Sequence, residues 1–387
     1  MSSGVTVSGD WLTRPSTQTV CRMLEAAGFQ ALLVGGCVRN ALLKKPVSDI
    51  DISTDARPDQ VINLAKVAGL KAIPTGIDHG TITVVADDIA HEITTFRKDV
   101  ETDGRRAVVA FSEHVEDDAH RRDFTMNALY ARADGSVIDP LGGLADLRKR
   151  RFRFIDDAAQ RIREDYLRIL RYFRFHAWYG DASLGMDPEA LAAIAAHSGG
   201  IDSLSKERVG AEMLKLLAAE DPAPVVATMR QCGVLSHIIE GADDRGLAPL
   251  VHMESALGVV CEPLRRLAVL GGQNVSDSLR LSKKRAQRLE HMRDAASGVK
   301  SAAELGYRFD GDLAVSAILL RSAWLEQPLP ECVVEDAKRG SLAEFPVQAA
   351  DLIAGFQGAA LGSELRRLEA LWIASGFTLS RKALLSK

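Results

Sequence analysis

A strand, a glycine pair, a short helix and a second strand follow one another near the start of the chain, and this order constrains the fold most. The residues are Leu33-Val-Gly-Gly-Cys-Val-Arg-Asn-Ala-Leu-Leu43 and then Ser48-Asp-Ile-Asp-Ile52. The apolar run predicts a buried strand, the segment from Val38 predicts a helix, and the second stretch predicts a strand. Side chains two positions apart on a strand share a face, so we expect Asp49 and Asp51 to converge.

This order of elements suits a phosphate-bearing substrate and a hard metal ion. Mg²⁺ binds through one or two carboxylates plus substrate phosphates, as Asp49 and Asp51 would allow. Gly35 and Gly36 have no side chain, so their backbone can approach a phosphate closely. The helix that follows would aim its first N–H groups at the same anion. A Gly-Gly pair alone is usually just a turn, and Asp-Ile-Asp alone is common on half-exposed strands. In this order and spacing, however, they predict nucleotidyl transfer.

Length and composition set outer limits on the protein. A chain of 387 residues exceeds a usual single core, so we expect two or more domains. The net charge of −4 gives no global basicity, although Lys and Arg gather at residues 148–177 and 279–293. Five scattered cysteines without a CxxC pair argue against disulfides or zinc and favour a reducing cytoplasm. We see neither a signal pattern nor a membrane-spanning apolar run, which predicts a cytoplasmic protein with no membrane partner.

The first part of the chain mixes helix and strand signals. Helices are predicted over residues 16–27 and 59–67, and strands over 31–34, 81–86 and 91–96, the last two forming a hairpin. Residues 97–110 are charged and lack periodicity, so they are predicted to form a mobile loop. Up to about Pro140 the chain therefore reads as α+β with a small sheet.

Strand signals nearly vanish after Leu141. Helical periodicity predicts helices over residues 162–178, 188–197, 205–217, 222–232, 264–270, 282–296, 313–324 and 361–373. The predicted fold class is α+β, with a small mixed-sheet head followed by an elongated all-helical remainder.

Three further segments carry a family resemblance. They are Arg121-Arg-Asp-Phe-Thr-Met-Asn-Ala128, Asp139-Pro-Leu-Gly-Gly-Leu-Ala-Asp-Leu147 and Arg161-Ile-Arg-Glu-Asp-Tyr-Leu-Arg168. With the aspartate strand before them, they resemble the motifs of class II CCA-adding enzymes and bacterial poly(A) polymerases, in the DNA polymerase β-like nucleotidyltransferase superfamily. The resemblance is strong over the first 180 residues and weaker beyond them. It implies a catalytic nucleotidyltransferase head (1–140), a helical neck that recognises the base (141–200), a helical body (201–270) and a helical tail that binds tRNA (271–387).

The resemblance assigns the catalytic carboxylates. Nucleotidyl transfer brings an RNA 3′-hydroxyl in line with the α-phosphorus, and two metal ions can activate the hydroxyl and neutralise the leaving pyrophosphate. Asp49 and Asp51 are the implied ligands of Mg²⁺, and Glu92 is the implied third catalytic carboxylate. The residues alone leave Glu92 open as an exposed strand residue.

Residues for the rest of the nucleotide follow from the same match. Arg122 is carried over to the triphosphate, which suits a side chain that donates two hydrogen bonds and stays charged. Asp123 and Asn127 are carried over to the ribose. Arg39 is a weaker phosphate candidate, equally readable as a buried salt-bridge former. The segment around Asp123 alone would also fit a capped helix start.

Base selection is the most distinctive expectation. On a helix, residues three apart share a face, so Asp165 and Arg168 should point together, with Glu164 beside them. A carboxylate only accepts hydrogen bonds and a guanidinium only donates them. That pair matches cytosine and adenine and leaves groups unpaired on guanine and uracil, so the expected substrates are CTP and ATP. Seen alone, the same letters are usually a surface ion pair.

Basic segments suggest where RNA binds. Arg148–Arg153 with Arg171 and Arg174 fit the tRNA 3′ end, and residues 279–293 fit the tRNA elbow, although solvated helix faces are the plain alternative. Arg171 is counted among the nucleotide-binding residues. Asn40 stands where the family often has Asp, which leaves one contact at the helix start open.

The first hypothesis is an enzyme that builds the 3′-terminal CCA of tRNA from CTP and ATP with Mg²⁺. A bacterial poly(A) polymerase is the alternative, but the basic-aromatic extension expected after the neck is not found. An enzyme that adds only CC or only A stays open. An inactive RNA-binding protein would have lost its acidic residues, and a small-molecule nucleotidyltransferase would not need so long a helical part.

Overall fold

The computed structural model describes residues 2–103, 106–181 and 183–386. The chain forms two compact units, one of Met1–Glu212 with Gln231–His237 and the other of Met213–Arg230 with Ile238–Lys387. The predicted four domains divide the chain more finely and stay a prediction. Within the described ranges, no helix has both the length and the apolar character needed to cross a membrane.

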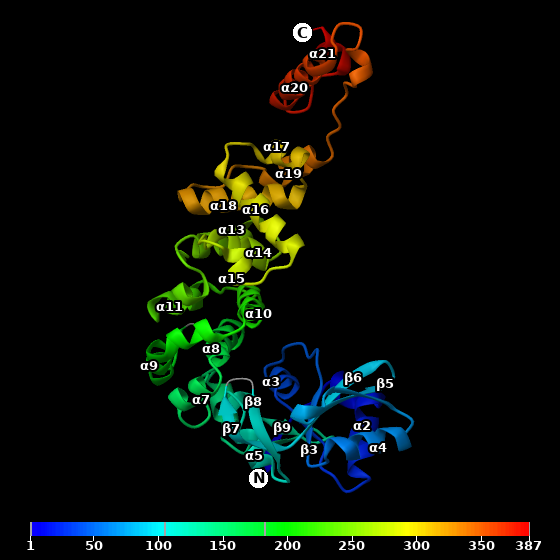
Figure 1. Ribbon diagram of the computed structural model, residues 1–387, viewed down its shortest axis with the longest axis vertical. Helices are drawn as coiled ribbons and strands as arrows, with labels where there is room; N and C mark the ends of the chain where they lie inside the picture. The colour runs from blue at the N-terminus through cyan, green and yellow to red at the C-terminus, as the bar shows by residue number, and fades with distance from the viewer. Residues whose placement is uncertain (1, 104–105, 182, 387) are drawn as a thin grey trace. The chain divides into compact units, whose positions relative to one another are not determined.

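The first unit is built on an eight-stranded sheet in the order β1-β10-β9-β2-β3-β6-β5-β4 (Figure 1). Its strands are β1 Ser2–Thr6, β2 Leu32–Val34, β3 Asp51–Thr54, β4 Lys71–Gly76, β5 Thr81–Ala86, β6 Ile89–Thr95, β9 Tyr130–Ala131 and β10 Ser136–Ile138. Strands β3 and β6 run parallel, and β5 and β6 form the predicted antiparallel hairpin. The mixed sheet confirms the α+β class.

The helices of this unit are α1 Asp10–Thr13, α2 Pro15–Glu25, α3 Gly36–Leu42, α4 Pro58–Val67, α5 Val115–His120, α6 Gly143–Arg148, α7 Ala158–Glu164, α8 Leu167–Tyr179, α9 Pro188–His197, α10 Lys206–Leu217, which continues into the second unit, and α12 Val234–Ile238, with short 3₁₀ turns η1 Ile77–His79, η2 Thr125–Asn127 and η3 Ser198–Ser203. Helices α2, α3 and α4 pack against strands of the sheet. Leu32, Val34, Phe96 and Tyr130 are buried in one core cluster. Since β2 leads into α3 and Tyr130 follows η2, this core fixes the segments that carry the predicted site.

The segment 97–110 is not an irregular loop. It forms β7 Arg97–Asp103 and β8 Arg106–Phe111, which pair antiparallel as a separate two-stranded sheet with an irregularity between Asp99 and Glu101. Residues 104 and 105 lie outside the described residues. The prediction failed because the charged residues 97–106 lack alternation, and the apolar stretch Ala107-Val-Val-Ala-Phe111 after them was not recognised as a strand.

The second unit is helical, as predicted. Its helices are α11 Ala223–Gln231, α13 Leu247–Leu257, α14 Pro263–Val269, α15 Val275–Ser278, α16 Lys283–Ser297, α17 Ala302–Arg308, α18 Gly311–Leu325, α19 Val333–Ser341, α20 Gly358–Ala374 and α21 Arg381–Leu385, with the 3₁₀ turn η4 Ala349–Asp351. Helix α18 is apolar around most of its circumference and is accordingly buried along its length. A separate cluster around Trp372 and Leu368 closes the C-terminal part.

Candidate active site

The predicted acidic residues lie on neighbouring strands. Asp51 begins β3 and is paired in parallel register with Glu92 of β6, while Asp49 lies just before β3 and is exposed. The amide of Glu92 donates to the carbonyl of Ile50 at 3.1 Å, which locks this register. Glu92, which the resemblance implied as third carboxylate, therefore lies beside the aspartate segment, although only Asp51 of the two aspartates belongs to the strand.

The charges around Asp51 fit a divalent cation. Burial and the neighbouring carboxylates of Glu92 and Asp49 outweigh the opposing effect of Arg122, and together they raise the pKa of the Asp51 carboxyl to about 6. A cation between these carboxylates would relieve that cost. In the described part of the chain no three His, Cys, Asp or Glu side chains converge as a complete ligand set. The acids therefore suit an ion such as Mg²⁺, which takes its other ligands from phosphate and water.

The glycine turn brings two guanidinium groups to one place. Gly35 adopts φ +71°, a conformation that favours glycine, and α3 begins at Gly36 rather than at Val38 as predicted. A Cβ built on Gly35 would lie 3.5 Å from Nη1 of Arg122, and one on Gly36 would lie 3.9 Å from Nη2 of Arg39. The absence of side chains leaves both guanidinium groups facing the turn.

Arg122 is held by a buried carboxylate that the sequence reasoning missed. Asp118 is fully buried and accepts hydrogen bonds from Arg122 at 2.9 Å and from Arg121 at 2.7 Å. It also accepts from the hydroxyls of Tyr130 at 2.8 Å and Ser53 at 3.2 Å. The available signal was its spacing, three and four residues before two arginines in a helix.

The predicted ribose residues form one hydrogen-bonded chain. Asn127 donates from Nδ2 to Asp123 at 2.8 Å, and its Oδ1 accepts from Arg39 at 2.5 Å. Arg171 pairs with the other oxygen of Asp123 at 2.6 Å. Burial would raise the pKa of Asp123, but Arg171 and Asn127 outweigh it and lower the pKa to about 2. Arg39 is buried as one interpretation expected, but within the described ranges its hydrogen-bond partners are neutral and it forms no salt bridge.

The residues predicted to select the base do not share a helix face. The predicted helix over 162–178 breaks into α7 and α8, and Asp165 between them is extended, at φ −154° and ψ 105°. Its Oδ1 accepts from the amide of Leu167 at 3.1 Å, and its Oδ2 accepts from Arg208 at 2.6 Å. Capping by a short polar side chain competes with the helix, which explains the break.

Arg168 pairs with Glu164 rather than with Asp165. Its Nη1 donates to Glu164 at 2.6 Å and to the carbonyl of Arg161 at 2.7 Å. Its Nη2 donates to the carbonyl of Arg121 at 3.3 Å, next to the predicted triphosphate arginine. The expectation that Asp165 and Arg168 point together from one helix face is therefore wrong. The carboxylate of Asp165 and the guanidinium of Arg168 still lie on adjoining segments.

The arginines proposed for RNA are largely engaged within the first unit. Arg151 pairs with Asp187, Arg153 with Asp146 and Arg174 with Glu212, at 2.5, 2.9 and 2.5 Å. Asn40 accepts two hydrogen bonds from Arg39 and donates to the carbonyl of Pro46, which accounts for the helix-start contact left open above.

Comparison with known proteins sets this geometry in a family. Residues 31–153 match the poly A polymerase head domain, and residues 184–245 match the family described as the probable RNA and SrmB-binding site of polymerase A. The chain is 30% identical over 379 residues to the mitochondrial CCA tRNA nucleotidyltransferase 1 of Danio rerio, covering 92% of this chain and 86% of the relative. The chain belongs to the CCA-adding tRNA nucleotidyltransferase family. It is accordingly a nucleotidyltransferase.

Two further relatives agree with this assignment. The CCA-adding enzyme of Streptococcus pneumoniae serotype 19F (strain G54) is 32% identical over 329 residues, which cover 82% of this chain and 80% of that enzyme. The crystal structure of the Bacillus stearothermophilus CCA-adding enzyme in complex with CTP is 26% identical, with a TM-score of 0.70 and coverage of 93% of this chain and 92% of that one. The predicted family and enzyme class are therefore confirmed.

Proposed function

We propose that this enzyme adds the 3′-terminal CCA to tRNA, using CTP and ATP. The observation that carries the proposal is the pairing of Asp51 with Glu92 on adjacent strands, beside a glycine turn faced by Arg39 and Arg122. This arrangement puts acidic ligands for a cation close to cationic donors for a triphosphate. The relative named as a CCA tRNA nucleotidyltransferase and the relatives named as CCA-adding enzymes, one of them solved with CTP, support this reaction on tRNA and CTP as a substrate.

Each part of the nucleotide has a group to receive it. Asp49 and Asp51 would hold Mg²⁺, which would activate the RNA 3′-hydroxyl and neutralise the leaving pyrophosphate. The backbone of Gly35 and Gly36 admits the triphosphate, and Arg122 donates to its oxygens. Glu92 keeps the acidic character of the site between β3 and β6.

The sugar would meet the hydrogen-bonded pair of Asp123 and Asn127. Arg39 and Arg171 hold this pair from its two sides, so its side chains are fixed before the nucleotide arrives. A fixed polar pair can distinguish a ribose hydroxyl from its absence at little entropic cost.

Base selection would use Asp165 as acceptor and Arg168 as donor, with Glu164 orienting Arg168. In the free protein Asp165 is bonded to Arg208 and Arg168 to Glu164. Cytosine and adenine supply the donor and acceptor that these residues need, and guanine and uracil supply the reverse. The side chains then act in place of a nucleic-acid template.

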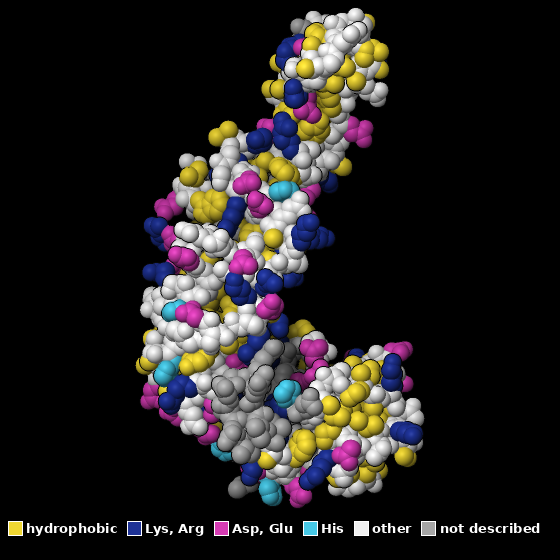
Figure 2. All heavy atoms as spheres, in the orientation of Figure 1, with side chains coloured by type: hydrophobic (Ala, Val, Ile, Leu, Met, Phe, Trp, Pro, Cys, Tyr) yellow, Lys and Arg dark blue, Asp and Glu magenta, His cyan; other side chains and the backbone are white. Residues whose placement is uncertain are grey.

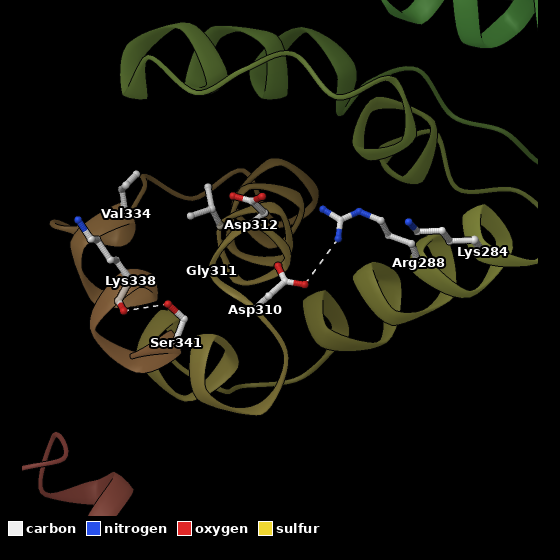
Figure 3. A pocket seen from close by; sticks show the side chains of 9 residues that line it. Lys284, Arg288, Asp310, Gly311, Asp312, Val334, Lys338 and Ser341 are labelled. Atoms are coloured by element: carbon white, nitrogen blue, oxygen red, sulfur yellow. Dashed lines mark hydrogen bonds and ion pairs between the residues drawn. The ribbon is translucent and has the colours of Figure 1, made fainter. Parts of the chain in front are cut away.

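The second unit offers basic side chains for the tRNA elbow. Helix α16 starts with the exposed Lys283, Lys284 and Arg285. A cavity of about 710 Å³ adjoins it, with Lys284 and Arg288 on one wall and Lys338 on the other (Figure 3). Lys and Arg side chains recur over this unit among acidic ones (Figure 2), and such basic side chains can neutralise RNA phosphates.

We also propose that the enzyme acts in the cytoplasm. All five cysteines are free, which suits a reducing compartment.

The proposal is tested by Asp51→Ala and Asp49→Ala. Both variants should lose incorporation of labelled CTP into tRNA that lacks its 3′ end, and both should keep nearly wild-type tRNA affinity in a filter-binding assay, because the carboxylates serve the metal ion and not the RNA. Asp59→Ala, an acid at the start of α4, is the matched control and should keep full activity. Substantial turnover by either site variant would refute the metal assignment.

A further inference from the structure

One buried arginine differs from the others in its partners. Among the described residues, four arginines are at most 6% exposed: Arg39, Arg161, Arg265 and Arg266. Arg161 pairs with Glu164, and Arg265 and Arg266 pair with Glu254. Arg39 has no carboxylate partner in the described part of the chain.

The direct hydrogen-bond partners of Arg39 are neutral, and the carboxylate of Asp123 acts on it only from beyond Asn127. Its Nε and Nη2 donate to Oδ1 of Asn40 at 3.2 and 2.9 Å, its Nη1 donates to Oδ1 of Asn127, and its Nη2 also donates to the hydroxyl of Tyr179 at 3.2 Å. Its guanidinium carbon lies 4.9 Å and 4.4 Å from the ring centres of Phe175 and Tyr179. These contacts satisfy four of its five N–H groups, and the two rings attract the cation, but no hydrogen-bond partner carries a formal negative charge.

Leaving such a charge uncompensated is costly. A guanidinium does not deprotonate in proteins, so burial without a counter-ion lowers stability. Asn40 is the residue best placed to supply a counter-ion, because its Oδ1 already accepts two hydrogen bonds from the Arg39 guanidinium. Asp at this position would make the same two bonds with a negative charge. The neutral amide is therefore what keeps Arg39 unpaired.

The unpaired charge faces the glycine turn. A Cβ on Gly36 would lie 3.9 Å from Nη2 of Arg39, so the guanidinium lies directly behind this backbone. On the other side, Arg122 faces Gly35, and its carboxylate partner Asp118 is shared with Arg121. A guanidinium group thus lies on each flank of the turn.

We propose that Asn40 is an affinity-setting residue: by staying neutral it reserves the charge of Arg39 for the polyphosphate of the incoming nucleotide at the Gly35–Gly36 turn. The inference rests on the proposed function, in which the same turn receives the triphosphate. Asn40 itself positions Arg39 and takes no part in the chemistry. The polyphosphate of the nucleotide then supplies the negative charge that Arg39 lacks in the free protein.

Asn40→Asp tests this directly, with Asn63→Asp as matched control. Asn63 is exposed on α4, so that variant makes the same change in net charge away from the turn. Calorimetry with the full-length protein and Mg²⁺ should show CTP binding about tenfold weaker in N40D and unchanged in N63D, the order expected when one nearby buried charge is cancelled. The deficit should shrink from CTP to CDP to CMP and vanish for cytidine. The thermal midpoint of ligand-free N40D should rise, since a buried guanidinium gains its counter-ion.

Four other outcomes would overturn the inference. CTP affinity that is unchanged or increased in N40D, a deficit of equal size for cytidine, or a ligand-free N40D that is less stable than wild type would overturn the inference. An equal loss in N63D would attribute the effect to overall charge and overturn it too. A wild type that binds no CTP would refute the proposed function and this inference together, whereas normal wild-type binding with an indifferent N40D refutes the inference alone.

Discussion

Replacing Asp118 by Asn should destabilise the first unit strongly. Asp118 is fully buried and is the counter-ion of both Arg121 and Arg122, whose side chains are only 16% and 17% exposed. Removing one partner of a buried pair costs about 3–5 kcal/mol. Because both guanidinium groups keep some access to water, we expect about 3 kcal/mol, a large share of a typical 5–15 kcal/mol. Urea unfolding followed by circular dichroism measures this loss.

The pH dependence of the free energy of unfolding is a second test of Asp118→Asn. Burial would raise the pKa of Asp118, but Arg122 and Arg121 outweigh it and hold the pKa well below its usual range. The stabilisation is therefore complete above the unfolded-state pKa, near 4, and is lost as the pH falls below it. The gap between wild type and variant should shrink on acidification.

The control for Asp118 is Asp187→Asn. Asp187 pairs with Arg151, whose side chain is 51% exposed, and Asn can still cap α9 in its place. We expect this variant to lose less than about 1 kcal/mol. Equal losses in the two variants, or a gap that widens at low pH, would refute the reasoning.

Three shorter predictions concern the reaction. Asp165→Ala should raise UTP and GTP misincorporation relative to correct addition in a four-nucleotide competition; an unchanged profile at a lower rate would leave Asp165 as a structural partner of Arg208. Shortening residues 98–106 should leave C addition working and stop the terminal A, since a hairpin beside the site can reposition the base between steps, and equal loss of both would contradict this. In metal-free buffer, Asp51→Asn should be more stable than wild type by about 1–2 kcal/mol in thermal unfolding, because burial, Glu92 and Asp49 penalise the charged carboxylate, and lower stability would contradict it.

Local patterns predicted the acidic part of the site well. The alternation of residues 91–96 predicted the strand that carries Glu92, whereas the choice of Glu92 as third carboxylate came from the family resemblance; its parallel pairing with Asp51 agrees with both. The Gly-Gly pair also predicted the turn before α3, and Gly35 there adopts a positive φ, which favours glycine. Asp123 and Asn127 were expected to act together and are hydrogen-bonded.

Tertiary contacts decided what the patterns left open. The periodicity of residues 162–178 runs through Asp165 without interruption, and only the caps and Arg208, from another helix, make the break visible. Asp118 follows two other acids, Glu116 and Asp117, and the local sequence does not indicate that Asp118 is the one of the three that is buried. Whether Arg39 has a carboxylate partner likewise depends on residues distant in sequence.

The central claim is addition of CCA with bases chosen by protein side chains. The most direct measurement incubates the purified protein with tRNA lacking its three terminal nucleotides, all four nucleoside triphosphates and Mg²⁺, and sequences the 3′ ends of the products. We predict ends of CCA, with neither G nor U above background and no further extension. Unchanged ends, a run of A, or ends that contain G or U would contradict the account.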